Sequence, residues 1–230
     1  MATDAIQVIR HPRARRVRLA VDRATGVVRL TLPPRAALAP ALKWAEGQQA
    51  WIERQRAALP DNVPYQVDAE IPFRGHPITI RWDAERRRSP ELIEGELWCG
   101  GPLDGLDQRI ERWLRAEALR LLSADSAEYA TRAGVTIASV ALTNARRRWG
   151  SCSSDGALRY NWRLVLAPDW VRRATAAHEV AHRLHMDHSP AFHAAVARIF
   201  GEDPAPANAW LRQHGPGLHR IGRAEPELGA

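Results

Sequence analysis

The segment from His178 to His188 constrains this chain more than any other part of its sequence. It contains a His-Glu-x-x-His motif, with histidines at positions 178 and 182 and Glu179 between them, and a further histidine six residues after the second. On an α-helix, residues four apart lie on the same face, one turn from each other. His178 and His182 can therefore direct two imidazoles at one metal ion, and we expect a helix here.

The residue types of this segment fit zinc. Zn²⁺ accepts neutral imidazole in a tetrahedral shell, and catalytic zinc has three protein ligands and leaves the fourth position to water. Glu179 is predicted to be the general base that takes a proton from that water. His188 can be the third ligand if the helix ends near residues 184–187 and the chain turns back. Ser189-Pro190 suits the start of another helix, whereas Glu202 is the alternative third ligand.

The composition is that of a soluble globular protein, with 45% hydrophobic and 26% charged residues. No apolar stretch reaches the eighteen residues typical of a transmembrane helix, so we expect no membrane partner. The first residues lack the pattern of a secretory signal. The two cysteines, Cys99 and Cys152, are expected to be free thiols, which favours a cytoplasmic location.

Positive charge is concentrated near the N-terminus. The net charge is +7, and residues 1–60 contain eleven Arg and Lys against four Asp and Glu. Such an excess can bind nucleic acid or another polyanion. No nucleic-acid-binding motif accompanies it, so a solvated, arginine-rich strand face is the simpler interpretation.

Hydrophobic patterning predicts a β-rich N-terminal region with one helix, residues 1–102. Alternation over residues 15–32 predicts a hairpin. The glycine pair at Gly100-Gly101, followed by Pro102, is the clearest break in the chain and is our predicted domain boundary. Within this region we expect a helix over residues 39–58 and strands within residues 65–82 and 96–99.

Residues 103–214 are predicted to form the metal-binding domain of an α+β protein. A long amphipathic helix over residues 106–132 is expected to end at Gly134. An edge strand near the ion could hold an extended peptide through its backbone. The other expected elements are strands over 135–142 and 157–166, a loop over 150–156, a metal-bearing helix from Pro168, helices over 191–200 and 205–213, and a loose tail over 215–230.

Several runs together resemble the YgjP-like metal-dependent hydrolases, relatives of the SprT-like zincin proteases. The resemblance covers about residues 10–200 and rests on Arg148-Trp149-Gly150-Ser151-Cys152, on residues 158–168, on the His-Glu-x-x-His motif, and on His188-Ser189-Pro190-x-Phe192. It implies a zincin-like metallopeptidase domain with His178, His182 and His188 as ligands and Glu179 as the catalytic residue. His193 departs from the family pattern, which has a tryptophan after the phenylalanine.

Residues near the motif supply candidate substrate contacts. Arg148 and Arg163 could stabilise an oxyanion or bind phosphate, and Asn161 could donate to a bound peptide. The alternatives are stacking of the arginines on Trp149 or Trp162 and pairing of Asn161 within the sheet. His185 is expected to pack or to face solvent, Asp187 is a candidate acceptor for a ligand N–H or a turn residue, and Cys152 is not expected to be a nucleophile.

These features predict a metallopeptidase with one Zn²⁺ per chain and a peptide or protein substrate. A UTP pyrophosphatase is an alternative, because the resemblance includes proteins labelled as such enzymes. Phosphoryl chemistry commonly uses carboxylate-bound magnesium, whereas three histidines favour zinc. A basic nucleic-acid-binding adaptor with a structural zinc is the third possibility, although a structural zinc normally has four protein ligands.

Overall fold

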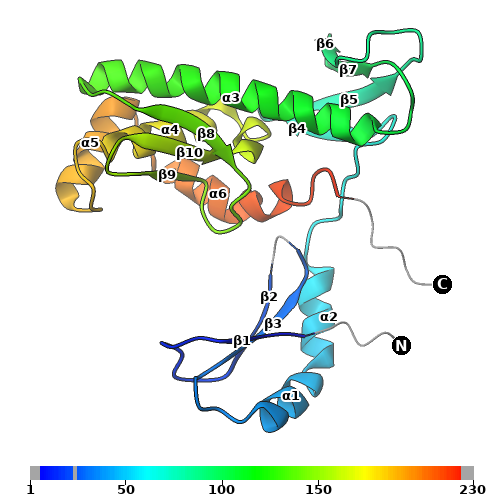
Figure 1. Cartoon of the computed structure of the whole chain (residues 1–230), viewed down its shortest axis with the longest axis vertical. Helices are drawn as coiled ribbons and strands as arrows, with labels where there is room; N and C mark the ends of the chain where they lie inside the picture. The colour runs from blue at the N-terminus through cyan, green and yellow to red at the C-terminus, as the bar shows by residue number, and fades with distance from the viewer. Residues whose placement is uncertain (1–5, 23–24, 224–230) are drawn as a thin grey trace. The chain divides into compact units, whose positions relative to one another are not determined.

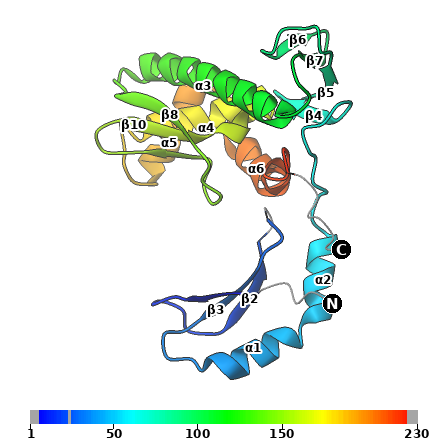
Figure 2. The same cartoon turned by 45° about the vertical axis from the view of Figure 1, so that its right-hand side comes forward.

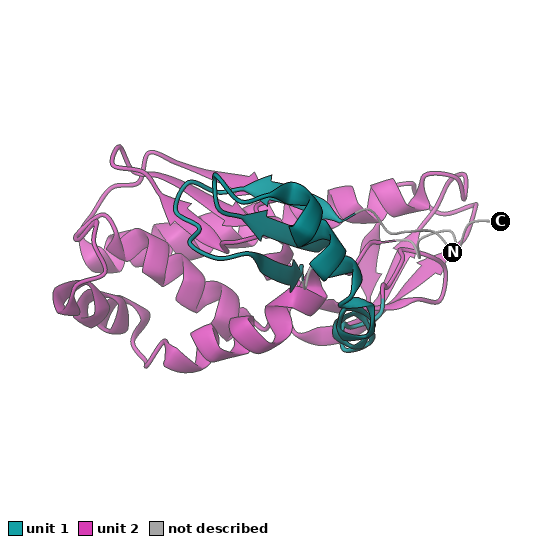
Figure 3. Ribbon diagram, turned by 90° about the horizontal axis from the view of Figure 1, so that it is seen from below, with its two compact units in different colours: residues 1–61 teal, residues 62–230 magenta. Residues whose placement is uncertain are grey.

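The computed structural model of the protein describes residues 6–22 and 25–223. The chain divides into two compact units, residues 1–61 and residues 62–230, which Figure 3 shows in different colours. We call them unit 1 and unit 2. Together they have the mixed helices and strands of the expected α+β class.

Unit 1 is a three-stranded sheet with two short helices. The antiparallel pair β2 (Arg18–Val21) and β3 (Val28–Leu32) confirms the predicted hairpin, and β1 (Gln7–Arg10) pairs with β3 in parallel. Alternate residues of β3 are buried, and Leu30 and Leu32 share a core with α1. The single helix predicted over 39–58 was wrong. The structure has α1 (Leu38–Glu46) and α2 (Gln49–Ala57), because the chain leaves the helix at Gly47, a poor helix former.

Unit 2 begins with a four-stranded sheet that packs against the N-terminal half of a long helix, α3 (Leu106–Ala133) (Figure 1). As expected, α3 ends at Gly134, whose φ of 67° suits a residue without a side chain. The strands, in the spatial order β4-β5-β7-β6, are β4 (Glu70–Phe73), β5 (His76–Trp82), β7 (Glu96–Cys99) and β6 (Glu91–Ile93).

The predicted boundary at residue 102 falls inside unit 2, since the division between units lies after residue 61. The physical reason is a shared core. Ile80 and Leu97 of the four-stranded sheet belong to the same buried cluster as Ile110 and Leu114 of α3. The glycine pair at 100–101 lies within this unit, and its amides donate to the carbonyl oxygens of Arg87 and Ala84.

A second sheet of unit 2 has the order β8-β10-β9. β10 (Ala157–Asn161) is parallel to β8 (Ser139–Thr143) and antiparallel to β9 (Gly150–Cys152), which forms one edge. Two predictions were wrong here. The loop expected over 150–156 begins with β9, and the strand expected over 157–166 ends at Asn161. There the Asn161 side chain accepts a hydrogen bond from Arg163 N and starts a 3₁₀ helix, η1 (Trp162–Val165).

Three helices complete unit 2, namely α4 (Asp169–Ala181), α5 (Pro190–Phe200) and α6 (Ala205–Leu218). In Figures 1 and 2, α4 lies between α3 and the other helices. A buried ion pair joins α4 to α3, with Arg172 Nε 2.7 Å from Asp125 Oδ2. A hydrogen bond of 2.9 Å between Ser126 and the Tyr160 hydroxyl joins α3 to β10.

The loose tail predicted over 215–230 was wrong for residues 215–223. The helix α6 continues to Leu218, and Ile221 forms a parallel bridge with Val63. Residues 224–230 lie outside the described residues. No helix within the described ranges is long and apolar enough to cross a bilayer.

Candidate metal centre

The site forms where α4 ends and the chain turns back. His178 lies in the last turn of α4, and His182 is the residue that caps it. Ser189 then caps α5, its hydroxyl accepting a hydrogen bond from Phe192 N. The Asp187 carboxylate accepts from Ser189 N at 3.2 Å and fixes the turn between the two helices. This return places His188 beside the two helical histidines.

The three histidines can share one ion. Their ring nitrogens lie within 4.8 Å of one another, and Nε2 of His178 is 3.4 Å from Nε2 of His188. Two nitrogens held about 2.05 Å from a tetrahedral zinc would be about 3.3 Å apart. The observed separation therefore suits two ligands of one ion, and the donor set fits the metal that the sequence predicts.

Among the described residues, these three histidines are the one group of His, Cys, Asp or Glu side chains arranged to hold a metal. Glu202, the alternative third ligand, is exposed and does not belong to the group. His193 is also outside it, although its ring centroid lies 6.4 Å from that of His188.

A backbone carbonyl orients one of these histidines. Nδ1 of His182 is 3.1 Å from the carbonyl oxygen of His185, to which it donates when that nitrogen carries the proton. The Nε2 atom is then left free for a metal. The sequence suggested Asp187 for this orienting role, but the Asp187 carboxylate accepts from Ser189 N instead. A carbonyl carries no sequence signature, so the part played by His185 could not be predicted.

Phe192 packs against all three rings. It is fully buried, and its ring centroid lies 4.9, 4.4 and 4.8 Å from those of His178, His182 and His188. Packing of this kind fixes ring orientation before a metal arrives. The sequence motif contains Phe192 but does not predict this role. The one sequence feature that could have indicated this role is the position of Phe192 three residues after the Ser189 cap, in the first turn of α5.

Burial sets the protonation states of the site. It lowers the pKa of His178 to about 4, with His182 and His188 adding to the effect, and it also lowers the pKa of His182. Neutral imidazole is the form that binds a metal. Burial has the opposite effect on the neighbouring carboxyl and raises the pKa of Glu179 to about 7, while the positive charge of Arg148 opposes this rise. A carboxyl with such a pKa can both accept and return a proton near neutral pH.

Gly150, at the start of β9, gives the Glu179 side chain its space. A Cβ atom at position 150 would lie 2.3 Å from Glu179 Oε1 and 2.6 Å from its Cγ, closer than real contacts allow. The carboxylate therefore lies directly against the backbone of the edge strand. The sequence pattern placed Gly150 in a loop and gave no sign of this contact.

Of the three predicted substrate contacts, Arg148 is exposed, whereas Asn161 and Arg163 are buried. Arg148 is exposed just before β9 and acts electrostatically on Glu179. Asn161 is fully buried, donates to Ala145 O at 2.7 Å and accepts from Arg163 N. The Arg163 guanidinium donates to Asn144 and lies 4.4 Å from the ring centre of Trp162. The side chains of Asn161 and Arg163 thus hold the fold around η1. Cys152 is half-buried, and burial raises the pKa of its thiol, which disfavours the reactive thiolate.

A family model described as the YgjP-like metallopeptidase domain matches residues 15–214, and the chain therefore belongs to this family. The resemblance seen in the sequence is thereby confirmed. No curated protein and no solved structure matches the chain. Membership supports a metal-dependent hydrolase of metallopeptidase type, and the histidine group is a place where its metal can bind.

Replacing His188 should separate the two candidates for the third ligand. Loss of a residue that hydrogen-bonds to a metal ligand costs about 10- to 100-fold in metal affinity. Loss of a ligand itself, in His188→Ala, should therefore weaken zinc binding by about 100-fold or more. His185→Ala is the matched control, because only the backbone oxygen of that residue contacts His182. Zinc affinity is measured by competition with a chelating dye. Wild-type affinity in His188→Ala together with weak binding in Glu202→Gln would reverse the assignment.

Glu179→Gln should stabilise the metal-free protein at alkaline pH. The pKa of Glu179 is about 7 in the folded protein, above its ordinary value of 4.5. Below the unfolded pKa the carboxyl is protonated in both states, so Glu179 does not lower the free energy of unfolding there. The cost of ionising it then grows as pH rises and is complete above the folded pKa. At ~1.4 kcal/mol per pKa unit, the variant should gain about 3–4 kcal/mol over wild type at high pH. Denaturant unfolding with chelator present, near pH 5 and near pH 8.5, measures this. An equal difference at both pH values would contradict it.

Proposed function

We propose that this member of the YgjP-like family is a zinc-dependent peptidase in which Glu179 is the general base. The observation that carries the proposal is the buried Glu179 carboxyl, which follows His178 of the three-histidine group in α4 and lies against an edge strand. In this proposal the histidines are the ligand set, Glu179 is the base and the edge strand is a backbone surface for the substrate.

The donor set supports zinc over harder cations. Imidazole suits zinc and similar transition ions, whereas magnesium and calcium prefer oxygen ligands. The group of three holds no carboxylate. When bound, the ion would polarise the scissile carbonyl and activate a water for attack. Phe192 keeps the three imidazoles in place, because its ring contacts each of them.

Glu179 would move the proton. Its carboxylate would accept a proton from the attacking water and then deliver the proton to the leaving nitrogen. Contact with the backbone of Gly150 limits where the carboxylate can lie. Arg148, exposed beside the site, is the remaining candidate for a contact to the substrate or to its developing negative charge.

The free edge of β9 suits a peptide. Trp149 O accepts from Asn161 N, and Ser153 N donates to Ala157 O, so residues 149 and 153 point their backbone groups toward β10. Alternation along an antiparallel strand then directs the backbone groups of Gly150 and Cys152 to the open side. An extended substrate can add to this edge through main-chain hydrogen bonds, next to Glu179.

Hydrolysis of a nucleotide such as UTP is less well supported by the same site. That reaction would place a polyphosphate where the group of three offers no carboxylate to bind magnesium. The open strand edge, in contrast, offers donors and acceptors in the spacing of a peptide backbone. A pure nucleic-acid-binding role would leave the buried Glu179 carboxyl without a use.

The proposal predicts zinc-dependent cleavage of an unfolded protein substrate that Glu179→Gln lowers by about 100-fold or more, the usual range for loss of a general base. Zinc content should remain at wild-type level. Glu202→Gln is the matched control and should keep full activity, since that carboxylate is outside the histidine group. Pyrophosphate release from UTP is measured in parallel. Cleavage of UTP but of no peptide, or activity that survives in Glu179→Gln, would overturn the assignment.

Gly150→Ala should lower peptidase activity while leaving metal binding intact. The added methyl collides with the Glu179 carboxylate and must displace it, and a general base out of reach loses most of its contribution, about 100-fold. Ser151→Ala is the control, because neighbouring side chains on a strand point to opposite faces. Turnover and zinc content are compared for both variants. Full turnover in Gly150→Ala would show that the contact with Glu179 is not needed.

A further inference from the structure

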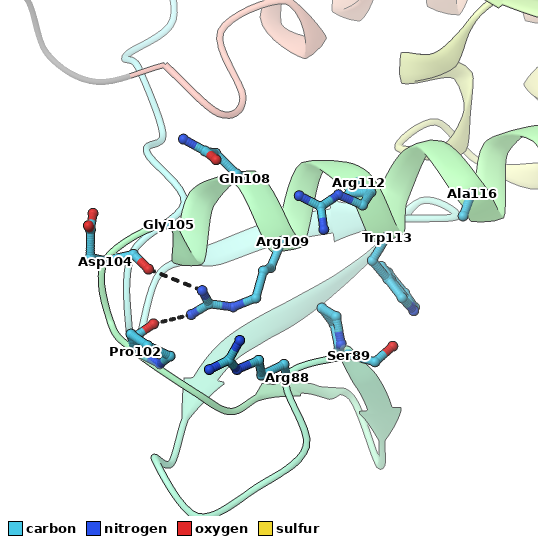
Figure 4. A pocket seen from close by; sticks show the side chains of 11 residues that line it. Arg88, Ser89, Pro102, Asp104, Gly105, Gln108, Arg109, Arg112, Trp113 and Ala116 are labelled. Carbon is cyan, nitrogen blue, oxygen red and sulfur yellow. Dashed lines mark hydrogen bonds between the residues drawn. The ribbon is translucent and has the colours of Figure 1, made fainter.

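Unit 2 contains a cavity that is lined by none of the three histidines. It has a volume of about 740 Å³ and lies between the loop at residues 88–90 and the first turns of α3 (Figure 4). Three arginines line it, Arg88 from the loop and Arg109 and Arg112 from the helix, and Trp113 lies at one end. The volume falls within the range of small-molecule sites.

The wall that carries Arg88 is built by the glycine pair after β7. A Cβ at Gly100 would lie 1.9 Å from the carbonyl oxygen of Arg86, and a Cβ at Gly101 would lie 2.6 Å from Cγ of Arg88. The loop can therefore lie directly on this backbone. Hydrogen bonds from Gly100 N to Arg87 O and from the Cys99 thiol to Arg88 O fix it there. Arg88 thus faces α3 from a fixed support.

Positive charge in the cavity is not neutralised from within. Arg109 donates to the carbonyl oxygens of Pro102 and Asp104, which hold the guanidinium in place and leave its charge uncompensated. Within the part of the chain that the structure describes, neither Arg88 nor Arg112 forms an ion pair. Asp104 is the only acidic residue lining the cavity, so three arginines less one aspartate leave a net charge of +2.

We propose that this cavity binds a small phosphate-bearing anion through Arg88, Arg109 and Arg112. Figure 4 shows the Arg109 guanidinium directed at the carbonyl oxygens of Pro102 and Asp104, with the Arg88 side chain on the loop that faces the helix. Like charges so placed repel each other, and a bound anion relieves that repulsion. Guanidinium matches the geometry of phosphate oxygens and forms paired hydrogen bonds with them. The indole of Trp113 adds an apolar wall that can accommodate an attached ring.

The cavity is separate from the metal centre. It lies along residues 105–116, in the first turns of α3, whereas α5 is joined to the other end of that helix by the bond from Arg132 to Ile199 O. The helix has 28 residues and is therefore about 40 Å long. An anion bound here does not touch the histidines, so the inference stands independently of the proposed peptidase.

Titration calorimetry with inorganic pyrophosphate on the full chain tests the proposal. Binding should weaken by about tenfold or more in Arg88→Gln and in Arg112→Gln, because each loses a charge-assisted pair of hydrogen bonds. Arg120→Gln is the matched control. It removes the same charge from α3, but Arg120 pairs with Glu117 and lies outside the cavity. Equal loss in Arg120→Gln, or no binding by wild type at millimolar pyrophosphate, would overturn the proposal.

Further titrations distinguish this cavity from the metal centre and identify the class of anion. Pyrophosphate also binds metals, so the titration is repeated in His182→Ala, where affinity should be unchanged. Binding that disappears there and survives in the arginine variants would assign the anion to the metal centre and sink the proposal. Citrate binding as tightly as pyrophosphate would also refute it, since the site would not select phosphate. Tighter binding of ATP than of pyrophosphate indicates a nucleotide, and equal binding indicates an inorganic anion.

Discussion

The three-histidine group depends on where α4 stops. If the helix continued through residue 188, His188 would lie about 15 Å along the axis from His178 and on another face. Instead the helix ends at His182, and the turn fixed by Asp187 and Ser189 returns the chain. The same turn starts α5, which places Phe192 against all three imidazoles. One helix end therefore creates the site and supplies the side chain that orders it.

The position of α4 is in turn set by its contact with α3. Arg172 and Asp125 are almost completely buried, and such a pair is costly to desolvate but fixes one arrangement because either partner alone would be worse. Any sliding of α4 would move His178, His182 and Glu179 together. It would also displace Glu179 from its contact with Gly150, where there is no room for even a Cβ atom. The ion pair thus helps to hold α4 at the position where Glu179 contacts Gly150 of β9.

The local pattern predicted the grouping of the three histidines better than the contacts around them. The helix that carries His178, its ending before His188 and the cap at Ser189 all followed from spacing and capping rules. The contacts of Gly150 and of the His185 carbonyl did not, because they join backbone atoms to residues distant in sequence or give no side-chain signal. The boundary at residue 102 was misplaced for a similar reason: a turn of two glycines looks like a linker until the shared core is seen.

The short length of β9 affects whether the protein associates with other molecules through this strand edge. An open edge that accepts a substrate strand can also accept the edge of another molecule, which is a route to aggregation. This edge strand has three residues, and the first is a glycine, which has no side chain to pack against another molecule. Two copies would gain too few hydrogen bonds to stay joined. In the proposed peptidase, a peptide whose carbonyl a metal also held would have a second anchor, which another protein's strand edge would lack.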